Sequence, residues 1–130
     1  MKGIDTNVLV RYLVQDEPGQ GRKATAFITK KCSADAPGLI NRIVLCEVVW
    51  VLERAYQYPR NQVAGALDKI LRTSQFKIED HQEVWAALRE YQTGGDFADA
   101  LIAAINRRLG CEYTVTFDRR AGRSSGFSLL

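Results

Sequence analysis

Histidine and cysteine are scarce in this chain of 130 residues, and their scarcity excludes several classes of chemistry. The single histidine, His81, rules out multi-histidine zinc sites, and it leaves triad or relay mechanisms only if this one residue serves. The three cysteines, Cys32, Cys46 and Cys111, are odd in number and lack CxxC spacing. This usage disfavours a disulfide framework and a thiolate zinc site, and it fits a reducing cytoplasm. Any metal would therefore need oxygen ligands.

Long apolar runs and strong charge are also missing. The most apolar stretch, Ile43 to Leu52, is half the length of a membrane span and contains Glu47, and no charged and apolar leader opens the sequence. We therefore expect neither membrane insertion nor secretion. The formal charge of +3 is too small to indicate a nucleic-acid partner by itself. The length and average composition predict one globular domain over residues 1–130.

Hydrophobic periodicity predicts short strands alternating with helices. The expected strands cover Met1–Ile4, Leu39–Ile40, Phe76–Ile78 and Tyr113–Phe117. Expected helices begin at a cap on Thr6 or Asn7, at Glu17 and at a cap on Asn61, and others cover Ile43–Tyr56, His81–Tyr91 and Phe97–Leu109, with Gly110 as the last C-cap. The Ile43–Tyr56 helix is apolar on both faces, so we expect the core to cover one face and a second subunit the other. The alternation predicts an α/β sandwich around a mostly parallel sheet.

Acidic residues stand at unusual places in this pattern. Asp5 and Asp118 each follow a predicted strand, at the sheet edge where ligands of α/β folds bind. Glu47 lies among apolar neighbours and has no basic residue three or four positions away. Alternatively, Glu47 is an exposed helix residue or forms a salt bridge with a more distant base such as Arg42 or Arg11. Alternatively, Asp5 is a helix cap or turn former, and Asp118 forms a surface ion pair.

The segment from Gly94 to Ile102 adds two more acids in the first turn of a helix. Asp96 occupies the expected N-cap, and capping alone explains it. Asp99 lies beside the inward-facing stripe of the helix, where a purely structural role is harder to assign. We therefore predict that Asp5, Glu47, Asp99 and Asp118 converge on one pocket at the end of the sheet.

Four carboxylates in one pocket would repel one another unless cations neutralise them or some of the acids hold protons. Oxygen ligands of this kind suit Mg²⁺ or Mn²⁺, which favour phosphate-bearing substrates. Such a site can activate water against a phosphodiester, which is nuclease chemistry. The charge distribution agrees, because acids prevail between Glu79 and Asp99 and arginines prevail after position 106. These arginines are either a phosphate-binding surface or a solvated face: Arg107, Arg108, Arg119, Arg120 and Arg123.

The motifs resemble those of PIN-domain ribonucleases, and more narrowly of VapC-type toxins from toxin–antitoxin pairs. The resemblance covers the whole chain and rests on four blocks in order: Asp5-Thr6-Asn7-Val8-Leu9, Leu45-Cys46-Glu47-Val48-Val49-Trp50-Val51-Leu52, Asp96-Phe97-Ala98-Asp99-Ala100-Leu101-Ile102-Ala103 and Thr116-Phe117-Asp118. It implies a three-layer α/β/α fold and a Mg²⁺ or Mn²⁺ site built from Asp5, Glu47, Asp99 and Asp118. It also implies endonucleolytic RNA cleavage, a homodimer, and inhibition by a cognate VapB-type antitoxin.

The same resemblance assigns supporting roles to further residues. Asp96 matches an auxiliary acid, and Thr6, Asn7 and Thr116 match polar residues that orient the carboxylates. The nearby arginines, Arg119, Arg120 and Arg123, are candidates for contacts with the RNA backbone. One departure concerns the position after the second strand, where the family often carries a small hydroxyl residue and this chain has Asn41-Arg42.

Two rival interpretations remain open. A haloacid-dehalogenase-like phosphatase also begins with a strand and an aspartate, but it requires a second aspartate where this chain has Asn7. A catalytically silent PIN-like domain would bind RNA or a protein without cleaving it. The complete set of acids argues against this second rival.

Overall fold

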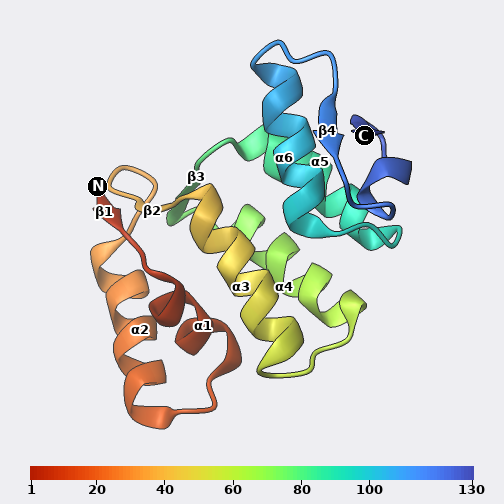
Figure 1. The fold of residues 1–130 in the computed structure, drawn as a ribbon. Helices are drawn as coiled ribbons and strands as arrows, with labels where there is room; N and C mark the ends of the chain where they lie inside the picture. The colour runs from red at the N-terminus through yellow and green to blue at the C-terminus, as the bar shows by residue number, and fades with distance from the viewer. The chain divides into compact units, whose positions relative to one another are not determined.

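Short strands alternate with helices throughout the computed structural model, which describes residues 1–130 (Figure 1). The chain divides into two compact units, Met1–Glu79 and Asp80–Leu130, and each is described here by itself. The first unit contains β1 (Lys2–Gly3), α1 (Thr6–Val14), α2 (Pro18–Lys31), β2 (Gly38–Ile40), α3 (Arg42–Arg54), α4 (Arg60–Arg72) and β3 (Phe76–Ile78). The second contains α5 (His81–Gln92), α6 (Phe97–Arg108), β4 (Thr114–Thr116), a 3-10 turn (Ala121–Arg123) and β5 (Phe127–Leu129).

The sheet of the first unit is fully parallel and has the order β1-β2-β3. Gly3 pairs with Leu39, and Leu39 pairs with Lys77, so the three strands are in close register. Because parallel strands end at the same edge, the residues that follow them share that edge. Asp5 follows β1 in this way, and Asn41 follows β2.

The core of the first unit lies where apolar helix faces meet. Leu45, Val48 and Leu52 of α3 recur at helical spacing and are fully buried, as is Leu9 of α1. The opposite face of α3 is exposed, since Trp50 keeps 56% of its surface accessible. The chain itself thus covers one face of this helix and not both, and a second subunit on the other face remains a prediction.

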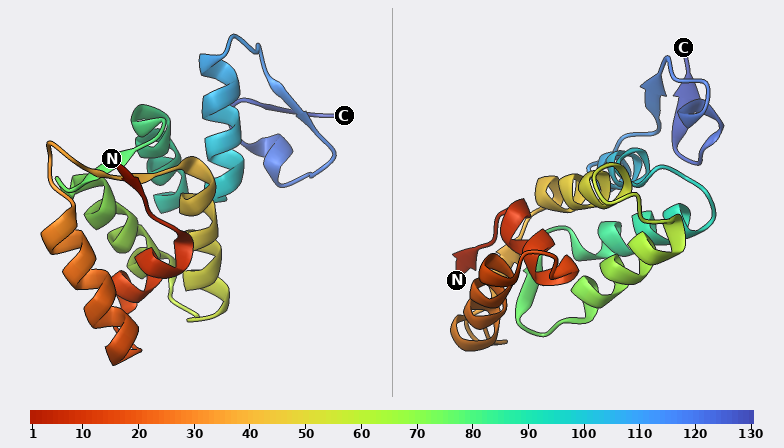
Figure 2. Two further views of the ribbon diagram at one scale, coloured as in Figure 1. Left: turned by 90° about the vertical axis from the view of Figure 1, so that its left-hand side faces the viewer. Right: turned by 90° about the horizontal axis from the view of Figure 1, so that it is seen from below.

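The second unit is built on two neighbouring helices, α5 and α6 (Figures 1 and 2). Tyr91 and Phe97 stand on either side of the turn that joins them, and their buried rings meet edge to face with centroids 6.4 Å apart. After α6 the chain forms β4, the 3-10 turn and β5, and the two strands pair in parallel. Every strand pairing within each of the two sheets is therefore parallel, as expected, but β4 and β5 form a sheet of their own.

The helix ends confirm some of the expected caps and correct others. Asp5, rather than Thr6 or Asn7, is the N-cap of α1, because its side chain accepts the first free N–H of the helix. α4 starts after Pro59 instead of an Asn61 cap, since proline fixes a backbone angle that suits a helix entry. Gly110 ends α6 as expected: its φ of +99° favours glycine, and the N–H groups of Gly110 and Cys111 bond the carbonyls of Arg107 and Asn106.

None of the helices combines the length and the apolar character that crossing a lipid bilayer requires.

Candidate active site

One hydroxyl joins two of the sequence-predicted acids in the first unit. The N–H of Thr6 donates to Asp5 Oδ1 at 2.8 Å, and its Oγ1 donates to Glu47 Oε1 at 2.6 Å. Asp5 lies at the junction of β1 and α1, and Glu47 lies on α3, which packs against α1. Helix packing therefore brings together two carboxylates that are 42 positions apart in the sequence.

Glu47 is exposed, as its structural alternative expected, and is not buried among its apolar neighbours. Its neighbours Val48 and Val49 point into the core, while the carboxylate lies on the open side of α3. Neither expected basic partner bonds it: Arg11 pairs with Asp16 at 3.3 Å and Arg42 pairs with Glu79 at 3.9 Å. No cation of this unit therefore neutralises Glu47 by direct contact.

A groove of about 620 Å³, here called the α1–α3 pocket, surrounds this pair of acids. Its lining includes Asp5, Thr6 and Glu47 together with Arg11, Trp50 and Tyr56. The predicted supporting residue Asn7 also lines it. Sequence analysis missed Tyr56. Burial is the main cause that raises the pKa of its hydroxyl, and a hydrogen bond to Asp16 raises this pKa further.

The other predicted acids lie in the second unit, around the start of α6. Asp96 caps the helix by accepting the N–H of Asp99 at 2.9 Å, as the sequence predicted. Partial burial raises the pKa of the Asp99 carboxyl, the negative charges of Asp96 and Asp118 raise it further, and the Arg120 guanidinium opposes them. Asp99 thus lies in the electric field of two other carboxylates, one of which is distant in sequence.

Asp118 holds the loop that follows β4. Its Oδ1 accepts the N–H of Arg120 at 2.8 Å and that of Ala121 at 3.3 Å, and its own N–H donates to Thr116 Oγ1 at 3.0 Å. Asp118 therefore bonds backbone groups instead of forming the surface ion pair considered above. These bonds fix the loop and leave Oδ2 for another partner.

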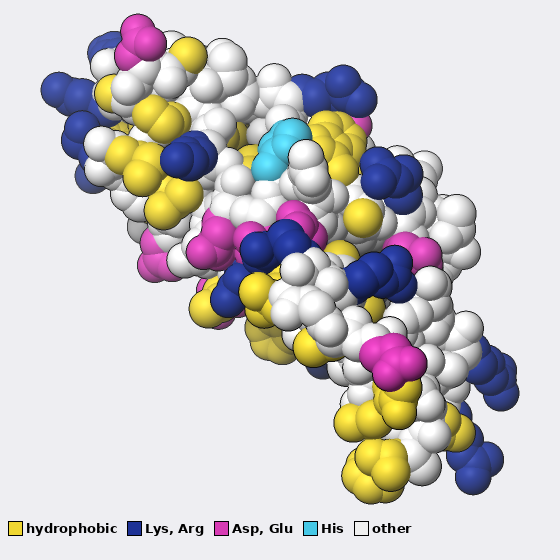
Figure 3. All heavy atoms as spheres, turned by 90° about the horizontal axis from the view of Figure 1, so that it is seen from above, with side chains coloured by type: hydrophobic (Ala, Val, Ile, Leu, Met, Phe, Trp, Pro, Cys, Tyr) yellow, Lys and Arg dark blue, Asp and Glu magenta, His cyan; other side chains and the backbone are white.

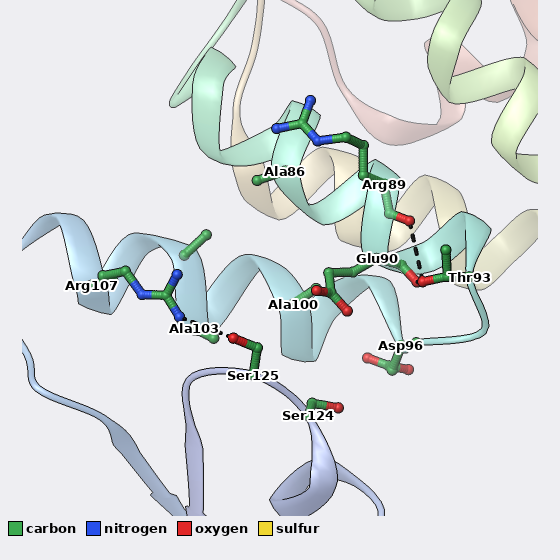
Figure 4. A pocket seen from close by; sticks show the side chains of 12 residues that line it. Ala86, Arg89, Glu90, Thr93, Asp96, Ala100, Ala103, Arg107, Ser124 and Ser125 are labelled. Atoms are coloured by element: carbon green, nitrogen blue, oxygen red, sulfur yellow. Dashed lines mark hydrogen bonds between the residues drawn. The ribbon is translucent and has the colours of Figure 1, made fainter.

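Arginines and serines border the acids of this unit. A pocket of about 320 Å³ is lined by Asp96, Asp99, Arg120 and Arg123, among others. An adjoining pocket of about 340 Å³ includes Arg107, which points toward Ser125 and bonds it at 3.4 Å (Figure 4). No sequence pattern marked the serines of this segment as site residues, because their position depends on the 3-10 turn.

Two residues from the sequence analysis have structural partners outside the acid clusters. Arg108 pairs with Asp80 at 2.7 Å and with Glu83 at 2.6 Å, so it links α6 to α5. The only histidine, His81, lies at the surface, where it is coloured cyan in Figure 3. Its Nε2 accepts a hydrogen bond from the indole of Trp85 at 3.0 Å.

The donor set is suited to a hard divalent cation, because it consists of carboxylates with hydroxyls beside them. Within either unit, no three His, Cys, Asp or Glu side chains are arranged to hold a metal ion. The structure brings Asp5 together with Glu47, and it brings Asp99 into the field of Asp96 and Asp118. That these two sets form one site remains a prediction.

Comparison with known protein families matches residues 3–125 to the PIN domain. The chain belongs to the PIN domain family. The match extends over both units of this PIN domain and includes every predicted acid. The predicted PIN-like α/β/α fold class is thereby confirmed.

The chain is also similar to a protein named VapC ribonuclease from Aquifex aeolicus (strain VF5). The two are 26% identical over 121 residues, which are 92% of this chain and 89% of that protein. The predicted resemblance of this PIN domain to the VapC type is thereby confirmed as well. Asn41 stands where the family often carries a small hydroxyl residue. It caps α3 by accepting the N–H of Val44 at 2.9 Å, so an amide oxygen provides the helix cap here.

Proposed function

We propose that this chain is a metal-dependent endoribonuclease and the toxin of a VapC-type toxin–antitoxin pair. The family and the likeness to a VapC ribonuclease support the nuclease activity. The observation that carries the proposal is the pair Asp5 and Glu47, joined by Thr6 at the edge of a parallel sheet. This edge is where α/β folds bind their ligands.

In this proposal Asp5, Glu47, Asp99 and Asp118 together hold Mg²⁺ or Mn²⁺, with Asp96 as an auxiliary acid. When bound, the cation supplies an activated water and neutralises charge on the phosphodiester. Thr6 keeps the carboxylates of Asp5 and Glu47 at a fixed separation by bonding both. The raised pKa of Asp99 supports this assignment, because crowded negative charge is relieved when a cation binds.

The remaining polar residues serve the site and the RNA. Thr116 holds the backbone N–H of Asp118, and Asn7 lines the α1–α3 pocket. The arginines that follow Asp118, namely Arg119, Arg120 and Arg123, are exposed and bind the RNA backbone. We place the activity in the cytoplasm, where the three free cysteines stay reduced.

The proposal includes two protein partners. A VapB-type antitoxin inhibits the enzyme, and two copies of the chain form a homodimer. On the exposed face of α3, Ile43 and Trp50 keep 66% and 56% of their surfaces accessible to solvent. Large apolar side chains exposed in this way support a contact with another chain.

The test is RNA digestion by the purified full chain with Mg²⁺ or Mn²⁺. We expect cleavage by the wild type, none by Asp5→Asn or Asp99→Asn, and wild-type rates for the matched control Asp35→Asn, whose side chain is exposed in a loop. Circular dichroism verifies that each variant is folded. If the metal raises the melting temperature while no RNA is cut, the chain is a binding module and the proposal is wrong.

A further inference from the structure

A second pocket, of about 440 Å³, opens between α1 and α2, which lie side by side (Figures 1 and 2). We call it the α1–α2 pocket. It shares Asp5, Asn7 and Arg11 with the α1–α3 pocket. The two hollows therefore share the acid that the proposed function assigns to the metal site. A polymer held at Asp5 would have its next unit within reach of the α1–α2 pocket.

Part of the lining of this pocket is apolar and contains an aromatic ring. Val8 of α1 and Ala24 and Phe27 of α2 line it. Phe27 is only half-buried, and its ring has no aromatic or cationic partner in the structure. An accessible ring beside small apolar side chains is the kind of surface on which proteins stack unpaired bases of single-stranded RNA.

Two cations stand at the edge of the pocket. Arg11 is held by three acceptors: Gln20 Oε1 at 2.7 Å, Asp16 Oδ1 at 3.3 Å and the Tyr56 hydroxyl at 3.0 Å. These bonds use Nε and Nη1, so Nη2 keeps two N–H groups without a protein acceptor. Lys23 of α2 is exposed and lines the pocket as well. An arginine fixed in this way is preorganised to bind a phosphate.

We propose that the α1–α2 pocket binds the nucleotide next to the scissile bond, with its base against Phe27 and Val8 and its phosphate at Arg11 and Lys23. This inference rests on the proposed nuclease function and adds a base-selecting subsite to it. The pairing of an unpartnered ring with two cations favours a nucleotide over an apolar peptide side chain. The pocket volume also lies within the range usual for small-molecule sites, about 300 to 1,000 Å³.

The first experiment measures base preference. The full chain digests a pool of random single-stranded RNAs with Mg²⁺, and the cut ends are sequenced. We expect the wild type to prefer one or two bases at a position beside the cut. Phe27→Ala removes that preference and raises KM about tenfold, because a base loses its stacking partner. Phe27→Leu, which keeps the apolar volume, verifies that the effect comes from the flat ring.

The second experiment isolates the charge of Lys23. Lys23→Gln should reduce the slope of log KM against log salt by about 0.7, the value expected for one lost phosphate contact on a single strand. The matched control is Lys30→Gln, two turns further along α2 and also exposed, but outside the lining of the pocket. Its slope should equal that of the wild type.

A third measurement is independent of cleavage. Each of the four nucleoside 5′-monophosphates is titrated into the isotope-labelled chain, and amide NMR shifts are followed. We expect shifts at Gly3, Val8 and Phe27, which line the pocket, and their loss in Phe27→Ala. If the wild type cuts no RNA but these shifts appear, the nuclease proposal fails and the nucleotide pocket stands.

Two results would overturn the inference. An active wild type whose base preference and salt slope survive both Phe27→Ala and Lys23→Gln would show that RNA does not use this pocket. Absence of shifts at the lining amides would contradict it as well. In either case the pocket is left for a segment of a protein partner.

Discussion

The Thr6 hydroxyl bonds the Glu47 carboxylate at 2.6 Å, and this contact joins the start of α1 to the middle of α3. The backbone N–H of the same threonine bonds Asp5. A single residue thus sets the distance between two acids that belong to different elements. Linking the two acids requires both the hydroxyl of Thr6 and its position in the first turn of α1.

Removing this hydroxyl should separate its effect on the site from its effect on the fold. Thr6→Val keeps the shape but leaves Glu47 Oε1 without its donor. We expect RNA cleavage to fall at least tenfold and the free energy of unfolding to fall by about 0.5 to 1.5 kcal/mol. Cleavage kinetics and urea unfolding measure the two effects. Thr6→Ser should restore most of the activity, and failure of this rescue would contradict the bridging role.

Asp5 serves both as helix cap and, in our proposal, as metal ligand, and two substitutions distinguish these roles. Asp5→Ala removes the cap and should lower the free energy of unfolding by about 1 kcal/mol. Asp5→Asn retains an oxygen that can cap α1, so the stability should stay near that of the wild type. Both variants should lose RNA cleavage. Urea unfolding together with an RNA digest provides the comparison, and an active Asp5→Asn protein would rule out the metal role.

Asp99 should make stability depend on pH in the metal-free protein. Its pKa in the folded state is raised above the ordinary value of 3.8, so ionisation opposes folding. Its favourable contribution is complete below pH 3.8 and is lost as the pH rises through the higher folded-state pKa. Asp99→Asn should therefore have the higher melting temperature at pH 7 in EDTA, and the difference should vanish near pH 3. Equal melting temperatures at pH 7 would contradict this.

The same substitution should reverse its effect when metal is present. Mg²⁺ binds the ionised carboxylates of the wild type, and the resulting stabilisation of the folded state grows with the logarithm of the Mg²⁺ concentration once this exceeds the dissociation constant. Asp99→Asn should gain less stability from the metal. Melting temperatures measured over a range of Mg²⁺ concentrations, with Asp35→Asn as the unaffected control, test this expectation.

Arg108 should matter for stability and little for RNA. Its guanidinium bonds Asp80 and Glu83, whose side chains are only 13% exposed, while Arg108 is 44% exposed. Arg108→Ala should therefore lower the free energy of unfolding by about 1 to 2 kcal/mol. This is less than a fully buried ion pair would cost, because the arginine is partly exposed to solvent. The salt dependence of RNA cleavage should not change. A reduced salt slope would instead place this arginine on the RNA.

The sequence predicted the local features of this protein because local features depend on near neighbours. The periodicity of Leu45, Val48 and Leu52 defined a helix with one buried face, and Gly110 marked a helix end. The alternation of strands and helices predicted parallel pairing. The four acidic blocks were sufficient to indicate the PIN family.

Contacts between residues far apart in the sequence depend on how the helices pack. Sequence spacing excluded a local basic partner for Glu47 and left Arg42 or Arg11 as distant candidates, but the packing of α1 on α3 placed Thr6 there. The apolar neighbours of Glu47 in the sequence made a carboxylate at this position unusual, but a helix turns successive side chains by about 100° and so exposes one residue beside two buried ones.

Most of the helices and strands, the parallel α/β class and the acids available for chemistry follow from the order of residues along the chain. The contact of Thr6 with Asp5 and Glu47, the bonds from Arg11 to Gln20 and Tyr56, and the open pocket at Phe27 arise only when the helices pack together. Hydrogen bonds act over about 3 Å. Residues far apart in the chain reach that distance only through the packing of whole helices.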